Sequence, residues 1–112
     1  MLVLQCTMNL QKDETVQSAI AYAARNQLLL AAICAAPMIF GQLGLLMGKN
    51  AVCYPGFEEY LEGANVKPDL CVADGSVITA KGAGASMLFG AEIVNYFKSG
   101  EGEKILKQMQ HA

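Results

Sequence analysis

The stretch from Leu28 to Pro37, LLLAAICAAP, constrains the fold of this chain more than any other. Its unbroken apolar run is typical of a β-strand that is buried on both faces, as in a parallel sheet. Pro37 favours the first turn of a helix, where its missing N–H costs no hydrogen bond. Cys34 is therefore predicted at a sharp strand-to-helix turn, between small neighbours. This is the cysteine equivalent of a nucleophile elbow, which raises a reactive side chain above the end of a sheet.

Two interpretations of Cys34 follow from this position. At a helix N-terminus the positive end of the helix dipole favours the thiolate, which is the reactive form of cysteine. Free cysteine is also among the most buried residue types, so the alternative is an inert thiol in the core. The pattern of residues leaves both open.

Composition narrows the classes of function. The chain has 112 residues, enough for one domain, with 54% hydrophobic residues, 16% charged residues and a net charge of −2. Without a basic cluster, no nucleic-acid partner is predicted. The four cysteines include no CxxC pair, so neither a metal site nor a cofactor is predicted. The longest apolar run, Leu28 to Phe40, is too short to span a bilayer, so no membrane partner is expected. No secretory signal is evident, and a cytoplasmic location with free thiols is the expectation.

The pattern along the chain predicts alternating strands and helices, and hence an α/β sandwich. The predicted elements are a strand over Met1–Leu4, a connection over Gln5–Leu10, a helix over Asp13–Asn26, the strand before Cys34, a helix from Pro37 to about Gln42 or Leu46, a strand over Asn50–Cys53, a short helical segment over Phe57–Leu61, a hairpin of Leu70–Ala73 and Ser76–Ala80 around Asp74-Gly75, a helix over Ser86–Lys98, and a last helix capped by Ser99. In open sheets of this class the site lies at the carboxyl ends of the strands. Cys34 and the loop Gly82–Ser86 both fall at such ends.

Several blocks of sequence resemble the ThiJ/PfpI family, in its order and at its spacing. The blocks are Ala31-Ala32-Ile33-Cys34-Ala35-Ala36-Pro37, Gly44-Leu45-Leu46, Cys53-Tyr54-Pro55-Gly56-Phe57-Glu58, Asp74-Gly75-Ser76-Val77-Ile78-Thr79 and Gly82-Ala83-Gly84-Ala85-Ser86. The resemblance implies a flavodoxin-like three-layer sandwich with a mainly parallel sheet, usually as a homodimer. It implies that Cys34 is a nucleophile in glyoxalase or protein deglycase chemistry on small aldehydes or glycated substrates.

The chain also departs from the family pattern. It resembles the C-terminal portion, so residues 1–112 are expected to form a single partial domain, incomplete at the N-terminal side. The family's N-terminal portion supplies a glutamate that hydrogen-bonds the cysteine, and no residue here can be assigned that role. Gln5–Asn9 stands where the family has a Pro-Gly-Gly oxyanion segment, which leaves the amide of Ala35 as the evident oxyanion donor. Tyr54 occupies a position that is histidine in several members.

Three functions are consistent with these residues. The first is an aldehyde-directed enzyme that uses Cys34, Ala35 and Tyr54, impaired by the missing portion. The second is an oxidative-stress sensor or chaperone-like protein, which needs only an oxidisable Cys34. The third is an inactive fragment. Missing strands would leave an unpaired sheet edge, so the chain is expected to associate with itself, as a homodimer or otherwise, or with a missing half, or to fold poorly.

The remaining candidates are interpreted as structural. Cys53 and Cys71 lie in apolar strand contexts and are expected in the core. Glu58 and Glu59 are adjacent on a short helix, which is typical of a solvated face. The loop Gly82–Ser86 lacks a GK[ST] ending, so a turn is favoured over a phosphate site.

Overall fold

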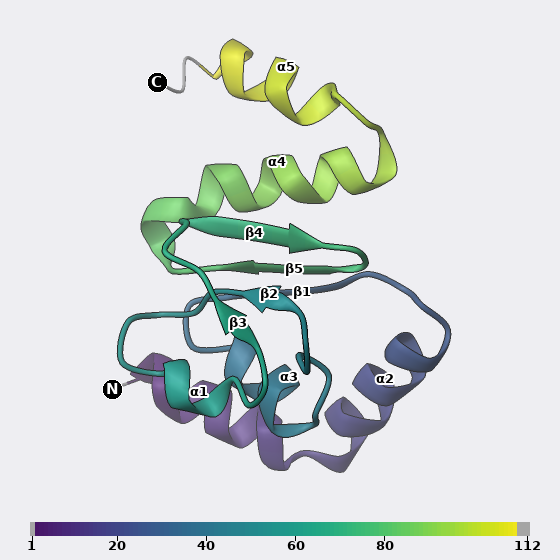
Figure 1. Cartoon of the computed structure of the whole chain (residues 1–112), viewed down its shortest axis with the longest axis vertical. Coiled ribbons are helices and arrows are strands. Elements are labelled where there is room, and N and C mark those ends of the chain that lie inside the picture. Colours follow the sequence, from purple (N-terminus) through teal and green to yellow (C-terminus); the bar gives the residue numbers. More distant parts are fainter. Residues whose placement is uncertain (1, 110–112) are drawn as a thin grey trace.

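The computed structural model describes residues 2–109, with side chains from Thr7 onward, as an α/β arrangement (Figure 1). The helices are α1 (Leu2–Lys12), α2 (Glu14–Arg25), α3 (Pro37–Gln42), η1 (Glu58–Tyr60), η2 (Ala83–Ala85), α4 (Ser86–Phe97) and α5 (Glu101–Gln108). The strands are β1 (Leu30–Ile33), β2 (Asn50–Ala51), β3 (Asn65–Val66), β4 (Cys71–Asp74) and β5 (Val77–Ala80). Within this range no helix is long and apolar enough to cross a membrane.

The main sheet has three strands in the order β1-β5-β4 and is mixed. β1 runs parallel to β5, with Ile33 opposite Ala80, so the carboxyl ends of the two strands meet. β4 and β5 form the predicted antiparallel hairpin, with Asp74 opposite Val77. Gly75, in its turn, has φ +61°, a conformation that glycine adopts without steric cost.

The prediction that the strand before Cys34 is buried on both faces is wrong. β1 lies at one edge of the sheet, and Ala31 on it is exposed. The central and completely buried strand is β5. An apolar run shows that a segment avoids water, but its place in the sheet depends on which strands pair with it.

Helices lie on both sides of the main sheet (Figure 1). α4 lies along one side, α2 and α3 lie on the other, and α5 packs outside α4. α2 begins as predicted, because the Asp13 carboxylate accepts hydrogen bonds from the backbone N–H groups of Thr15 (2.8 Å) and Val16 (3.2 Å). Ile20 and Ala23 on α2 pack against the core.

The predicted N-terminal strand and connection are wrong, because residues 2–12 form α1; Met1 lies outside the described residues. A run of four apolar residues carries too little periodicity to separate strand from helix. Ser99 is not the cap of the last helix. Gly100 holds that position with φ +86°, a left-handed conformation that favours glycine.

A second, two-stranded parallel sheet of β2 and β3 is fastened to the main sheet by side chains. The backbone N–H of Val52 donates to Thr79 Oγ1 (3.0 Å), and that of Asn50 donates to Asp74 Oδ2 (2.8 Å). The chain then runs on from Val52 to Cys53 and Tyr54, so these bonds position the segment that reaches Cys34. The core between the layers includes Leu30, Ala32, Phe40, Leu46, Ala51, Cys53, Leu61 and Val77.

Candidate functional site

The strand-to-helix turn at Cys34 forms as predicted. β1 ends at Ile33, Pro37 begins α3, and Cys34 between them has φ +64°. A residue with a Cβ in this left-handed region carries a cost of roughly 1–2 kcal/mol. The turn is closed by a hydrogen bond from the Ala36 N–H to the Ile33 carbonyl (3.2 Å). The side chain of Cys34 is partly exposed, whereas Ala35 is buried.

Two further backbone hydrogen bonds hold Cys34 in place. Its N–H donates to the carbonyl of Ala80 at the end of β5 (3.0 Å), and its carbonyl accepts from the N–H of Tyr54 (2.8 Å). Three segments that are distant in sequence therefore meet at the cysteine. Two of them were predicted to meet there, because parallel strands bring their carboxyl ends to one edge.

A cavity of about 360 Å³ lies beside this junction, lined by Tyr54, Pro55, Leu70, Lys81, Gly82, Ala83, Gly84 and Ala85. Tyr54 donates one of the hydrogen bonds that fix Cys34, and Lys81 follows Ala80, the acceptor of the other, whereas Cys34 itself is not among the residues that line the cavity. A Cβ at Gly82 would stand 3.5 Å from the Tyr54 ring, which is ordinary van der Waals contact, so the loop packs directly against the ring. The loop forms a turn, as predicted, closed by the hydrogen bond from the Ala85 N–H to the Gly82 carbonyl (2.8 Å), but no close approach at Gly82 or Gly84 excludes a Cβ. The loop also forms a wall of the cavity.

Lys81 is the site residue that the sequence analysis did not identify. It carries the only full charge among the residues that line this cavity. Its ammonium donates to the carbonyl of Pro68 (3.0 Å), which ties the side chain to the segment that precedes β4. The available signal was its position, directly after the strand whose end meets Cys34.

Burial governs the chemistry of Cys53 and Cys71. Burial raises the pKa of the Cys53 thiol from 9.0 to about 11, and the nearby Glu58 carboxylate adds to the rise. Burial, with a smaller effect of Glu92, also raises the pKa of the Cys71 thiol to about 11. Cys53 is in the core as predicted, whereas Cys71 is only partly buried. Both thiols stay protonated near neutral pH, which makes them weak nucleophiles.

Other predicted features have plain structural roles. Glu58 and Glu59 are exposed, and Glu58 Oε1 accepts a hydrogen bond from the Gly56 N–H (2.9 Å). In the part of the chain that the structure describes, no three His, Cys, Asp or Glu side chains form a group that could hold a metal ion. The predicted oxyanion role of Ala35 stays a prediction.

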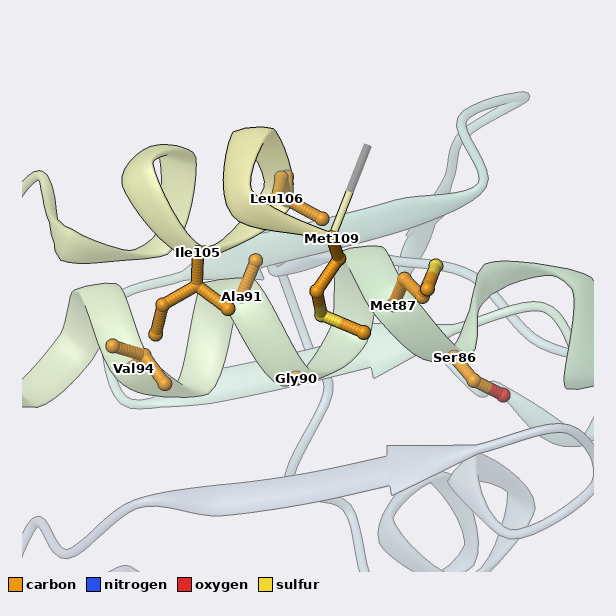
Figure 2. Close-up of a pocket in the computed structure, with 8 residues that line it drawn as sticks. All are labelled: Ser86, Met87, Gly90, Ala91, Val94, Ile105, Leu106 and Met109. Carbon is orange, nitrogen blue, oxygen red and sulfur yellow. The ribbon is translucent and has the colours of Figure 1, made fainter. Parts of the chain in front are cut away.

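A second hollow of about 360 Å³ lies between α4 and α5 and is almost entirely apolar (Figure 2). It is lined by Ser86, Met87, Gly90, Ala91, Val94, Ile105, Leu106 and Met109. It shares no lining residue with the cavity beside Cys34. The candidate site is the junction of β1, β5 and the segment that contains Tyr54, and the apolar hollow is separate from it.

These features define an α/β protein with a cysteine at a strained strand-to-helix elbow. Comparison with known protein families identifies the family within this class. The chain belongs to the DJ-1/PfpI family, whose pattern it matches over residues 5–96. The predicted resemblance is confirmed.

The chain matches curated relatives over only part of each relative's length. The chain is 44% identical over 68 residues to protein DJ-1 homolog B of Arabidopsis thaliana, covering 59% of this chain and 16% of that protein. It is 36% identical over 67 residues to protein dj-1beta of Drosophila melanogaster, covering 58% of this chain and 36% of that protein.

Solved structures agree on the fold. The crystal structure of Drosophila melanogaster DJ-1beta gives a TM-score of 0.84 at 26% identity, covering 95% of this chain and 59% of that one. A structure titled Toxoplasma gondii DJ-1, oxidized, gives 0.85 at 22% identity with the same coverage. The chain therefore spans well under two thirds of the relatives it matches.

Proposed function

We propose that this chain acts on reactive aldehydes through Cys34, in chemistry of the glyoxalase or protein deglycase type. The observation that carries the proposal is the left-handed turn at Cys34, which holds a partly exposed thiol on a backbone that is hydrogen-bonded to Tyr54, a residue of the cavity lining. A backbone cost at a single residue is typical of a functional position, because ordinary packing gives no reason to retain it. The family supports the same assignment.

The chemistry needs a thiolate and donors for the developing oxyanion. The Cys34 sulfur attacks the aldehyde carbon, a C–S bond forms, and the carbonyl electron pair moves to oxygen, which takes a proton to give a hemithioacetal. The backbone N–H of Ala35, the residue after the nucleophile, is the proposed oxyanion donor. Tyr54, which lines the cavity, is the proposed proton donor through its phenol.

A turnover assay with methylglyoxal tests this proposal. We expect consumption by the wild-type chain and none by Cys34→Ala. Cys71→Ala is the matched control, since it removes a half-buried thiol from β4, which does not pair with β1. Equal consumption by all three chains, or by none of them, would overturn the proposal.

An oxidative-stress function is the second candidate, favoured by the partial exposure of Cys34, whereas burial raises the pKa of the Cys53 and Cys71 thiols to about 11. One neighbour in the structural comparison is described as oxidized, which is a statement about that protein. Peroxide would convert Cys34 to a sulfinate while Cys53 stays reduced. Mass spectrometry after peroxide treatment distinguishes this function: sulfinate at Cys34 without methylglyoxal turnover favours it, and equal oxidation at Cys53 contradicts it.

Three further proposals concern the complete fold, its self-association and its compartment. We propose that the complete fold is a flavodoxin-like three-layer sandwich with a mainly parallel sheet, to which the strands described here contribute one part. We also propose self-association, as a homodimer, because β1 offers an edge of the main sheet for pairing. A reducing cytoplasm is the compartment that suits an unpaired reactive thiol.

A further inference from the structure

We infer that the cavity beside Cys34 selects negatively charged small molecules, and that Lys81 is the residue that recognises them. The ligand class is a small aldehyde or carbonyl compound that carries a carboxylate. The inference rests on the proposed function for its aldehyde, but the charge preference of the cavity can be measured without turnover.

The position of Lys81 carries the argument. It directly follows Ala80, whose carbonyl accepts a hydrogen bond from the N–H of Cys34 (3.0 Å). Lys81 is therefore one residue away from the backbone contact of Cys34. Lys81 lines the same cavity as Tyr54, whose N–H holds the Cys34 carbonyl (2.8 Å). A molecule that occupies the cavity thus contacts Lys81 and Tyr54, and both of these residues are next to the backbone hydrogen bonds of Cys34.

The charge of the cavity is one-sided. The lining residues besides Lys81 are Tyr54, Pro55, Leu70, Gly82, Ala83, Gly84 and Ala85, none of which has a carboxylate. A cation without an acidic neighbour in the lining attracts an anion more strongly than one that is already paired. Among the residues with described side chains, no carboxylate forms a salt bridge with Lys81.

The ammonium also has donors to spare. It makes one hydrogen bond, to the carbonyl of Pro68 (3.0 Å), and a lysine ammonium has three N–H donors. The bond to Pro68 holds the charge at the cavity while donors remain for a carboxylate. An ammonium that is held in place loses less side-chain entropy when a ligand binds.

Alkylation of Cys34 by iodoacetate and by iodoacetamide is the test. Both reagents react with the thiolate, which forms an S–C bond as iodide leaves with the electron pair of the C–I bond. They have similar size and differ in charge, so the ratio of their rate constants cancels the thiolate fraction of Cys34. That ratio reports the electrostatic attraction of the cavity and is read at each cysteine by mass spectrometry.

We expect Lys81→Met to lower the iodoacetate-to-iodoacetamide ratio at Cys34 about fivefold, and Lys81→Arg to keep it. High salt should reduce the difference, because the site is open to solvent. Lys67→Met is the matched control, since it removes the same charge from an exposed residue outside the cavity lining.

The outcomes separate the two proposals. An unchanged ratio in Lys81→Met, or an equal fall in Lys67→Met, would overturn the role of Lys81 even if methylglyoxal is consumed. A selective fall with no aldehyde consumption would support the anion site and contradict the proposed enzymatic function. Protection of Cys34 from iodoacetamide by glyoxylate, lost in Lys81→Met but kept for neutral methylglyoxal, is the result expected when both proposals hold.

Discussion

At the scale of the residue, the backbone of Cys34 is the clearest sign of a site, because its left-handed conformation opposes the preference of any residue with a Cβ. Glycine has no such penalty. The thiol is therefore retained at a position where glycine would fit the backbone better. This makes a prediction about stability that is independent of any activity.

Cys34→Gly should be more stable than Cys34→Ala by about 1 kcal/mol in the free energy of unfolding. Both substitutions remove the thiol, but only glycine removes the Cβ that opposes φ +64°. Urea denaturation measures the difference. Ala21→Gly, at an exposed position within α2, is the control and should lose up to about 1 kcal/mol. Equal stability of the two Cys34 variants would show that the turn is relaxed.

The two buried thiols predict how stability depends on alkaline pH. In the folded chain the pKa values of Cys53 and Cys71 are both about 11, against an ordinary value of 9.0. Between these values the unfolded chain releases protons that the folded chain keeps, so the free energy of unfolding falls as pH rises from about 9 to about 11. Below pH 9 the contribution is fully present.

The Cys53→Ala/Cys71→Ala double variant isolates this effect, because it removes both thiols and leaves every lysine and tyrosine in place. We expect its urea midpoint to fall less steeply over the same pH range than that of the wild type. Identical slopes would mean that the two thiols ionise equally in the folded and unfolded chains.

At the scale of the element, Thr79 joins the two sheets. It is completely buried in β5, and its hydroxyl oxygen accepts the hydrogen bond of the Val52 N–H. Thr79→Val keeps the shape but leaves a buried N–H without a partner, which should cost about 1–3 kcal/mol of unfolding free energy. Thr79→Ser keeps the acceptor and loses one methyl group, at about 1 kcal/mol. A Val variant no less stable than the Ser variant in urea would contradict this role.

The contact of α5 with α4 depends on Gly102. Its N–H donates to Asn95 Oδ1 (2.7 Å), and an added Cβ would overlap the carbonyl oxygen of Ala91. Gly102→Ala should therefore push the helices apart and cost roughly 1–3 kcal/mol. Gly90→Ala is the matched control, because a Cβ there meets no atom within 4 Å and alanine favours the helix by up to about 1 kcal/mol. Hydrogen exchange of α5 amides should rise only in Gly102→Ala.

The elements that the sequence predicts correctly are those with a local cause. Asp13 caps α2, Pro37 begins α3, and Asp74-Gly75 turns the hairpin, each through chemistry confined to a few residues. The failures occur where no local chemistry decides the structure. α1 contains an apolar run too short to identify, and the edge position of β1 depends on its neighbours in the sheet.

The candidate site also has one part that the sequence predicts and one part that it does not. The turn at Cys34 follows from apolar residues that lead into Pro37, so it could be predicted from the sequence. The cavity could not, because it requires Tyr54 and Lys81 to meet across the ends of two strands. Lys81 stands beside a glycine-rich loop and resembles any surface lysine until the fold places it.

At the scale of the whole molecule, the edge of the main sheet predicts association between copies. β1 pairs with β5 on one side, and the N–H groups of Leu30 and Cys34 donate toward β5. N–H groups alternate between the two sides of a strand, so those of Ala31 and Ile33 face away from β5. Among the described residues no strand pairs with this second side. An edge of this kind is a template for pairing with another chain.

Sedimentation velocity over a range of concentrations should therefore show a species larger than the monomer, and Ala31→Lys should shift the population toward the monomer. Ala31 is exposed, so a lysine there is tolerated by the fold but places like charges near each other when two edges pair. Ala21→Lys adds the same charge to an exposed position on α2 and should leave association unchanged. A monomer at every concentration, or an equal effect of both lysines, would show that the β1 edge does not carry self-association.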